Sequence, residues 1–324
     1  MMNRRLIATV GMLGAALVMT ACSSGSAEVT PAAESTTTDE VVVQEEPADS
    51  EAPAESGGEM QLAYTATLTG EFAVFGLDML DGVNLAIEQI NASGGINGAT
   101  VNLETADDQG KPTNGPVVAQ KFCDSGAAAV LGYSFSSVAL AAVPIYDQCG
   151  LSVIGSAVTS PELSGASTYF FRNVPTDAFQ GAEAGIFAVE KFGAKKIAVL
   201  FQQDDYGIGV QESFSTAVKD AGAEVTSAQG YQLGSRDFRS LLENAKSEGA
   251  ELIFIGGFYA EAAKIVQQAR EMGMEQQFMG TDGALSPDLI SLADGATEGM
   301  IIYTVFTITD PRPEVQDFVA AFEA

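Results

Sequence analysis

Residues 196–209 read KIAVLFQQDDYGIG, an apolar run followed by a short polar stretch and two glycines. The run at 197–201 is apolar at every position, and 252–255 repeats this pattern further along the chain. A strand that is buried on one face alternates apolar and polar residues, whereas a strand covered on both faces is apolar throughout. The sequence therefore predicts parallel sheets built from βαβ units, with helices on both faces.

Strands of this kind form two series along the chain, with helical segments between them. In one such segment Leu80, Val83, Ile87 and Ile90 share a helix face. The pattern predicts an α/β protein with two doubly wound parallel-sheet lobes and a ligand cleft between them. The expected strands are 61–67, 100–105, 127–132 and 151–155 in the first lobe, and 195–201, 224–230, 251–256, 277–280 and 299–303 in the second.

The composition excludes several classes of function. The formal net charge of −28 repels phosphate backbones, so we expect no nucleic-acid partner. The chain has no histidine and only three cysteines, which excludes Ser-His-Asp and Cys-His catalysis and the usual zinc sites. No phosphate-binding loop motif occurs, and the pairs Asp107-Asp108 and Asp204-Asp205 are typical of helix caps or solvated turns. We expect no enzyme, no metal site and no cofactor.

Ligand sites in open α/β sheets lie beyond the carboxyl ends of the strands. The loops expected there are rich in hydroxyl and aromatic side chains, and Asp177 and Asp282 lie near them. Hydroxyls and helix N-termini suit a carboxylate, a buried carboxylate suits an ammonium, and rings cover an apolar side chain. The inventory favours a free amino acid as ligand. The loop residues are Phe75, Tyr133, Ser134, Phe135, Ser136, Ser137, Ser156, Thr159, Tyr206, Phe258 and Tyr259.

The first 59 residues are typical of export and tethering. Residues 1–22 combine Arg4 and Arg5 with an apolar stretch at 6–21, and the end of this segment resembles the bacterial lipobox, in which Cys22 is lipidated. The alternatives are an ordinary signal peptide with an incidental cysteine or an uncleaved anchor. Residues 23–59 contain ten acidic residues and no basic or aromatic one, so we expect a disordered acidic linker.

The sequence over 60–324 resembles the branched-chain amino-acid-binding proteins of ATP-driven (ABC) importers, which have the type I periplasmic binding fold. The resemblance implies a substrate-binding lipoprotein that closes its lobes over an amino acid and delivers it to the importer's membrane subunits. Five segments carry it in register: Thr69-Gly70 with Phe75-Gly76, DGVNLAIEQINASGGINGATVNLETADDQGKP at 81–112, AVLGYSFSSVALAAVPIYDQCGLSVIGSAVTSPEL at 129–163, QQDDYGIG at 202–209, and QFMGTDGALSPDLISLADGATEGMIIYT at 277–304.

The resemblance implies roles for individual residues. Ser136 aligns with a serine that holds the ligand carboxylate, the alternative being an N-cap in front of a helix at 137–148. Ala157 and Thr159 align with a loop that holds the ammonium by carbonyl and hydroxyl, the alternative being an ordinary turn. Asp282 aligns with an acidic residue that pairs with the ammonium, although it also begins a common turn pair. Asp177 aligns with an aspartate near the cleft and could equally cap the next helix.

The aromatic candidates are Phe75, Phe135, Tyr206 and Phe258. Phe75 and Phe258 stand where the family has tyrosine, Tyr206 is retained, and Phe135 replaces a smaller residue. Core packing is the alternative for each ring. If they line the cleft, the pocket is apolar, which favours a leucine, isoleucine, valine or phenylalanine ligand over glutamate, lysine or urea.

Cys123 and Cys149 fall at the ends of two helices that flank the strand at 127–132. Right-handed crossovers place both helices on one sheet face, so we expect a disulfide in an exported protein, with two separate buried thiols as the alternative.

The lobes are expected at 60–173 plus 306–324 and at 174–305. The resemblance implies that lobe 1 is truncated at its C-terminus. We expect a monomer that is anchored through its lipid to the outer face of the cytoplasmic membrane, or on the periplasmic side in a Gram-negative cell. The alternatives are a ligand-sensing receptor domain of the same fold, or a pocket for an amide, urea or aromatic acid.

Overall fold

The computed structural model describes residues 57–324. The signal peptide predicted for 1–22, the lipidation predicted at Cys22 and most of the linker predicted for 23–59 lie outside the described residues. The end of that linker is corrected, because strand β1 begins at Gly57, three residues inside the predicted range.

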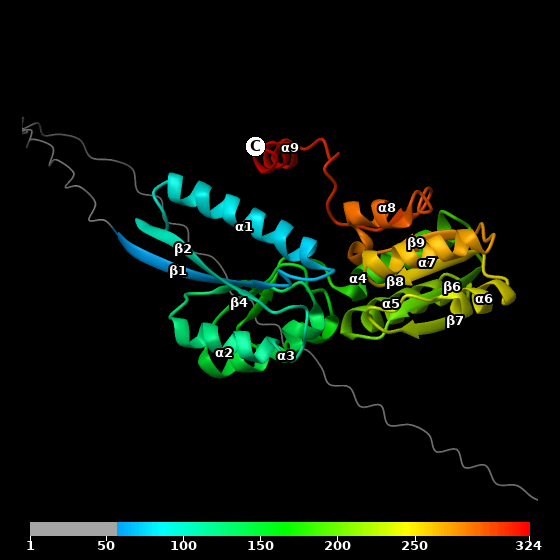
Figure 1. Ribbon diagram of the computed structural model, residues 1–324, viewed down its shortest axis with the longest axis horizontal. Coiled ribbons are helices and arrows are strands. Elements are labelled where there is room, and N and C mark those ends of the chain that lie inside the picture. The colour runs from blue at the N-terminus through cyan, green and yellow to red at the C-terminus, as the bar shows by residue number, and fades with distance from the viewer. Residues whose placement is uncertain (1–56) are drawn as a thin grey trace, which may run out of the picture. The chain divides into compact units, whose positions relative to one another are not determined.

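The first sheet is formed by strands from the N-terminal part of the described chain. Its order is β2-β1-β3-β4-β5, and every neighbouring pair is parallel. Helix α1 lies on one face, and α2 and α3 lie on the other (Figure 1). The elements are β1 (Gly57–Ala66), α1 (Ala73–Ala92), β2 (Ala99–Asp107), α2 (Gly115–Ser125), β3 (Val130–Gly132), α3 (Ser136–Cys149), β4 (Val153–Gly155), the 3-10 helix η1 (Pro161–Leu163) and β5 (Phe170–Arg172).

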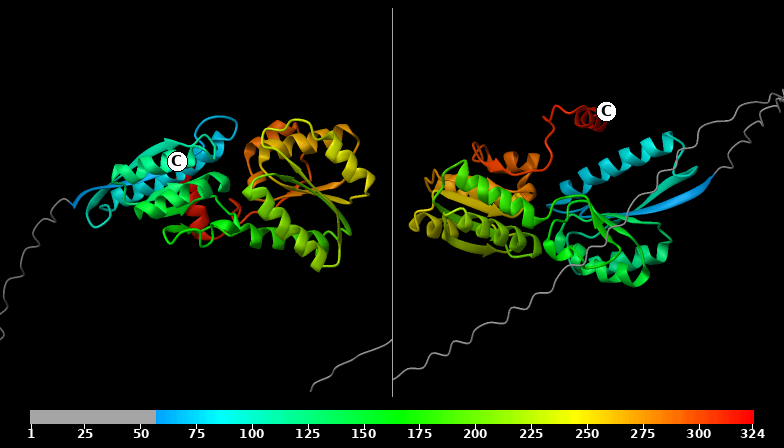
Figure 2. Two further views of the ribbon diagram at one scale, coloured as in Figure 1. Left: turned by 90° about the horizontal axis from the view of Figure 1, so that it is seen from below. Right: turned by 180° about the vertical axis from the view of Figure 1, so that it is seen from behind.

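The second sheet has the order β10-β9-β8-β6-β7 and is also parallel throughout. Its strands lie between two layers of helices (Figure 2). The elements are α4 (Asp177–Glu190), β6 (Lys196–Gln202), α5 (Asp205–Asp220), β7 (Glu224–Tyr231), α6 (Arg239–Ser247), β8 (Leu252–Gly256), α7 (Tyr259–Glu271), β9 (Gln277–Gly280), the 3-10 helix η2 (Asp282–Ala284), α8 (Pro287–Ala293) and β10 (Ile301–Ile302).

Alternate residues of β6 pack into two different cores. Ile197 and Val199 belong to the cluster that contains apolar residues of α4 and α5, whereas Ala198 and Leu200 belong to the cluster that contains residues of α6 and α7. A strand with helices on both faces needs apolar residues at every position. The predicted α/β architecture with two parallel sheets is therefore confirmed.

Strand lengths differ from the prediction near the middle of the first sheet. β3 and β4 have three residues each and begin three and two residues later than expected. Strand β5 was not predicted, because three half-exposed residues give no usable periodicity. In the second sheet β10 has only two residues, against five expected.

The two helices on one face of the first sheet are joined covalently. A disulfide links Cys123 of α2 to Cys149 of α3, with the two Cα atoms 6.1 Å apart. The last helix, α9 (Pro313–Phe322), contacts α1. Over residues 57–324, none of the helices combines the length and the apolar character that a bilayer crossing requires.

Candidate functional site

A cavity of about 110 Å³ lies between the two sheets. Every lining residue follows the carboxyl end of a strand, which is where the topology of open α/β sheets places ligand sites. The first sheet contributes Phe75, Ser134, Ser136 and Ala157, and the second contributes Tyr206, Phe258, Asp282 and Gly283. The volume is well above the 10–15 Å³ or so that one water needs, so a small solute fits.

Six of the nine predicted ligand residues line this cavity: Phe75, Ser136, Ala157, Tyr206, Phe258 and Asp282. Phe135, Thr159 and Asp177 do not line it. Two lining residues were outside the predicted set. Ser134 was among the hydroxyl-bearing loop residues of the sequence, so its side-chain type could have identified it as a cavity residue, whereas Gly283 contributes only backbone.

Hydroxyls and a helix N-terminus form the side of the cavity next to the first sheet. Ser136 is the first residue of α3, and Phe135 occupies the cap position, so the alternative role of Ser136 as an N-cap is wrong. Its side chain is 3% exposed, and its Oγ accepts a hydrogen bond from Ser160 N at 3.2 Å. The partial positive charge at the start of α3 and its first amide groups favour an anion here.

The backbone before α3 is unusual. Gly132 has φ +127°, where a Cβ would lie 2.0 Å from Thr65 O, so only glycine fits. Tyr133 follows with φ +67°, and its hydroxyl is 2.7 Å from that of Tyr146 in the core. This turn directs Ser134 back toward β1, where its Oγ accepts from Thr67 N at 3.2 Å.

A carboxylate and a tyrosine form the opposite side. Tyr206 OH donates to Asp282 Oδ1 at 2.8 Å, and Gly283 N donates to the same oxygen at 2.8 Å and to Tyr206 OH at 3.0 Å. Burial raises the pKa of Asp282, although these hydrogen bonds oppose the shift. A Cβ on Gly283 would lie 2.7 Å from Tyr206 OH, so glycine permits this close approach.

A second carboxylate lies beside the first. Asp177 is fully buried, and burial raises its pKa to about 7, with the charge of Asp282 as a further raising cause. Gln180 donates to Asp177 Oδ1 at 2.7 Å, whereas Asp177 Oδ2 and Thr159 Oγ1 are buried without a partner. The capping alternative for Asp177 is wrong, because Thr176 caps α4. No lysine or arginine is among the residues that line the cavity, so this region favours a cation.

Phe258 is at the centre of a cluster of rings from both sheets. Its ring centroid lies 4.6 Å from that of Phe135, 5.0 Å from Tyr206, 5.8 Å from Phe72 and 5.9 Å from Phe75. Phe72 was missed by sequence reasoning, although it precedes Phe75 by one helical turn. The rings make one wall of the cavity apolar.

Known proteins are similar to this chain in sequence and in fold. Residues 59–324 match the family described as periplasmic binding protein. The chain belongs to the periplasmic binding protein family. The leucine-, isoleucine-, valine-, threonine- and alanine-binding protein of Pseudomonas aeruginosa is 32% identical over 82% of this chain and 71% of its own length. The leucine-specific-binding protein of Salmonella typhimurium is 30% identical over 82% of this chain and 72% of its own length.

Solved structures agree with the sequence comparison. A leucine-binding protein from Thermotoga maritima has a TM-score of 0.77 at 27% identity and covers 82% of this chain and 75% of that one. A branched-chain amino acid transporter substrate-binding protein from Streptococcus pneumoniae, in complex with isoleucine, has a TM-score of 0.76 at 26% identity, covering 82% and 76%. The resemblance found in the sequence is confirmed.

This periplasmic binding protein has two halves, one with the first sheet (β1 to β5) and one with the second (α4 to β10), which also touch through polar contacts. Tyr259 OH donates to Glu71 O at 2.7 Å, and Lys264 Nζ lies 3.1 Å from Glu71 Oε1. Both contacts join α7 to the segment just before α1.

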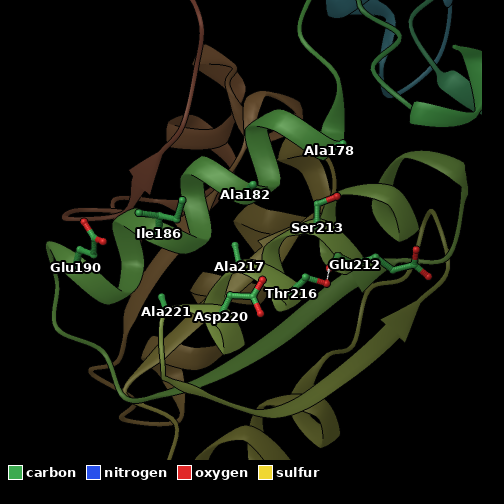
Figure 3. A pocket seen from close by; sticks show the side chains of 10 residues that line it. All are labelled: Ala178, Ala182, Ile186, Glu190, Glu212, Ser213, Thr216, Ala217, Asp220 and Ala221. Carbon is green, nitrogen blue, oxygen red and sulfur yellow. Dashed lines mark hydrogen bonds between the residues drawn. The ribbon is translucent and has the colours of Figure 1, made fainter. Parts of the chain in front are cut away.

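A larger hollow, of about 640 Å³, lies between α4 and α5 (Figure 3). Alanines form much of its floor, and Glu190, Glu212 and Asp220 lie around it. Its lining residues belong to α4 and α5 or directly follow α5, and none lies in a loop that follows a strand, so the smaller cavity is the better candidate for a solute site. Residues 57–324 contain no group of three or more Cys, Asp or Glu side chains placed to hold a metal ion.

Proposed function

We propose that this protein is the solute receptor of an ABC importer and binds a free amino acid with a branched or other apolar side chain. The observation that carries the proposal is the polarity of the cavity. Ser136 and the start of α3 lie on one side, and Asp282 lies on the other. A zwitterion has one charge for each side, and neither charge is stable in an apolar cavity without a partner.

In this proposal the ligand carboxylate lies against the α3 N-terminus and the Ser136 hydroxyl. The ammonium pairs with Asp282, with the carbonyl of Ala157 as a further partner. Asp177 lies behind them, and an ammonium beside it would lower its raised pKa and favour its charged form. The side chain then lies against Phe75, Tyr206 and Phe258. The names of the relatives support a related ligand class, because one is named for binding leucine, isoleucine, valine, threonine and alanine and the other for binding leucine.

Closure of the two halves follows from the placement of these groups. A ligand shifts an equilibrium between separated and closed halves only through contacts that differ between those states. Ser136 belongs to one half and Asp282 to the other, so one bound amino acid contacts both. Lipidation at Cys22 would keep the receptor outside the cytoplasmic membrane, next to the importer's membrane subunits.

Titration calorimetry with leucine tests the proposal. Asp282→Ala and Ser136→Ala should each weaken binding about tenfold or more, which is about 1.4 kcal/mol. Leucine amide and N-acetyl-leucine, which each lack one charge of leucine, should bind at least about tenfold more weakly than leucine. Unchanged leucine affinity in both variants would contradict the site assignment, and no binding of any apolar amino acid to the wild-type protein would contradict the function.

A further inference from the structure

A second hollow lies on the other side of the ring cluster. It has a volume of about 420 Å³ and, like the first cavity, it is lined from both halves of the protein. The residues that matter below are Phe135, Ser137, Gln202, Asp204 and Asp205.

The same loops line both spaces with different residues. After β3, Ser134 and Ser136 line the first cavity, whereas Phe135 and Ser137 line the second hollow. After β6, Tyr206 lines the first cavity, whereas Asp204 and Asp205 line the second hollow. The two spaces are therefore neighbouring compartments of one region between the halves.

Two rings separate the compartments. Phe258 lines the first and Phe135 lines the second, and their centroids are 4.6 Å apart with ring planes at 78°. Phe135 is 3% exposed and also packs against Phe72 at 5.5 Å. Backbone lies close behind it, because a Cβ on Gly110 would come within 2.7 Å of the Phe135 ring. The wall is thus packed on more than one side.

The second hollow offers hydrogen-bond acceptors to a cation. Asp204 and Asp205 line it together with Gln202, and no lysine or arginine is among its lining residues. The Gln202 side chain is 1% exposed and donates to Asp204 Oδ2 at 2.6 Å, but its Oε1 has no partner. Burial raises the pKa of Asp204 to about 6, although hydrogen bonds from Gly207 N and the Gln202 side chain oppose the shift.

We propose that the pair Phe135–Phe258 is a specificity wall that limits the length of the ligand side chain, and that the hollow beyond it would receive the cation of a lysine-like ligand if the wall were opened. The inference rests on the proposed function, since it assumes that an α-amino acid occupies the first cavity. The inference explains why the protein would reject lysine: a long basic side chain in the first cavity meets the rings of Phe135 and Phe258 before it reaches the acceptors of the second hollow.

The test compares leucine, lysine and 2-aminooctanoic acid by calorimetry on wild-type protein, Phe135→Leu and Phe135→Ala. Wild-type protein should bind leucine at least about tenfold more tightly than the two long ligands. In Phe135→Ala the preference for leucine over each long ligand should fall by about tenfold or more, and in Phe135→Leu by less. Phe135→Leu keeps an apolar side chain against Phe72, so it still tests the wall if Phe135→Ala does not fold.

Asp204→Asn, added to the opened variant, separates side-chain length from charge. Asp204 is the N-cap of α5 and accepts from Gly207 N at 2.9 Å, and asparagine caps a helix about as well as aspartate. The increase in relative affinity for lysine that opening the wall produces should shrink about fivefold or more, whereas the increase for 2-aminooctanoic acid should persist.

The outcomes distinguish the two hypotheses. If wild-type protein binds no amino acid, the proposed function fails. If leucine binds but the variants at Phe135 keep the wild-type preference within about twofold, the wall is refuted while the function stands. If Asp204→Asn reduces the affinities for lysine and for 2-aminooctanoic acid by the same factor, the hollow is not a site for a cation.

Discussion

Asp177 is a carboxylate held in a place where its charge is disfavoured. Burial raises its pKa to about 7 in the folded protein, from an ordinary value of 3.8. Between these two pH values the folded state holds a proton that the unfolded state has lost. The stabilisation that comes from this bound proton is therefore fully present below about pH 4, and the free energy of unfolding decreases as pH rises toward 7.

This linkage gives a prediction for the protein without ligand. Between pH 5 and pH 8 the free energy of unfolding of wild-type protein should fall by on the order of 2 kcal/mol more than that of Asp177→Asn, which cannot titrate. Denaturant unfolding at the two pH values measures the difference. Asp205→Asn is the matched control, because Asp205 begins α5 as Asp177 begins α4 but is partly exposed. Equal slopes for wild-type protein and Asp177→Asn would contradict the prediction.

The sequence predicted the cavity residues that depend only on strand ends. Ser136, Tyr206 and Asp282 follow apolar strands directly, and the parallel topology brings them together. The orientation of Phe72 and Phe75 could not be predicted in this way. Phe75 was expected in a loop, but α1 already begins at Ala73, and this start sets the direction of both rings. Thr159 and Asp177 were placed near the site, but which atoms face the cavity depends on loop conformation.

At the scale of helices, α4 and α5 pack closely because α4 carries glycines at the contact. A Cβ on Gly181 would lie 2.7 Å from Val210 O, and one on Gly185 would lie 2.8 Å from Phe214 O. Both neighbours are backbone atoms of α5, which cannot rotate away. Gly82 in α1 is different, since the nearest atom to its Cβ position is a ring carbon of Phe322 at 4.0 Å.

The same substitution should therefore have opposite effects in the two helices. Gly82→Ala should raise the free energy of unfolding by about 0.5–1 kcal/mol, because alanine has the higher helix propensity. Gly185→Ala gains the same propensity but forces α4 and α5 apart, so it should lower stability by about 1–3 kcal/mol. Denaturant unfolding of both variants measures the contrast. Stabilisation by Gly185→Ala would show that the helices separate without cost.

Short elements explain the main gap in the predicted fold. The long strands β6 and β8 have enough apolar residues to define their type and their burial on both faces. Strands β4 and β10 were predicted with five residues each but have three and two, and β5, with three, was missed, because strands this short have too few residues for periodicity to fix their bounds. Their positions are set by pairing with a neighbour already in the sheet, which is information from the whole fold.

At the scale of the whole molecule, the two halves meet through contacts that differ in how much they stabilise the interface. The hydrogen bond from Tyr259 OH to Glu71 O is part-buried, and the Tyr259 ring packs against Phe72 and Phe75 with centroids 5.6 and 5.1 Å away. The ion pair between Lys264 and Glu71 is more exposed, with side-chain exposures of 23% and 44%. Exposed pairs of this kind contribute little, because water screens them.

If ligand binding requires the halves to meet, removing the stronger contact should weaken binding without touching the cavity. Tyr259→Phe keeps the ring and deletes one hydrogen bond, worth about 0.5–1.5 kcal/mol, so leucine should bind about two- to tenfold more weakly. Lys264→Met keeps the apolar stem and should change affinity by less than about twofold. Calorimetry gives both affinities, and small-angle scattering with saturating leucine should give the same compact particle for wild-type protein and both variants. A larger loss from Lys264→Met than from Tyr259→Phe would mean that charge, rather than the buried contact, holds the halves together around the ligand.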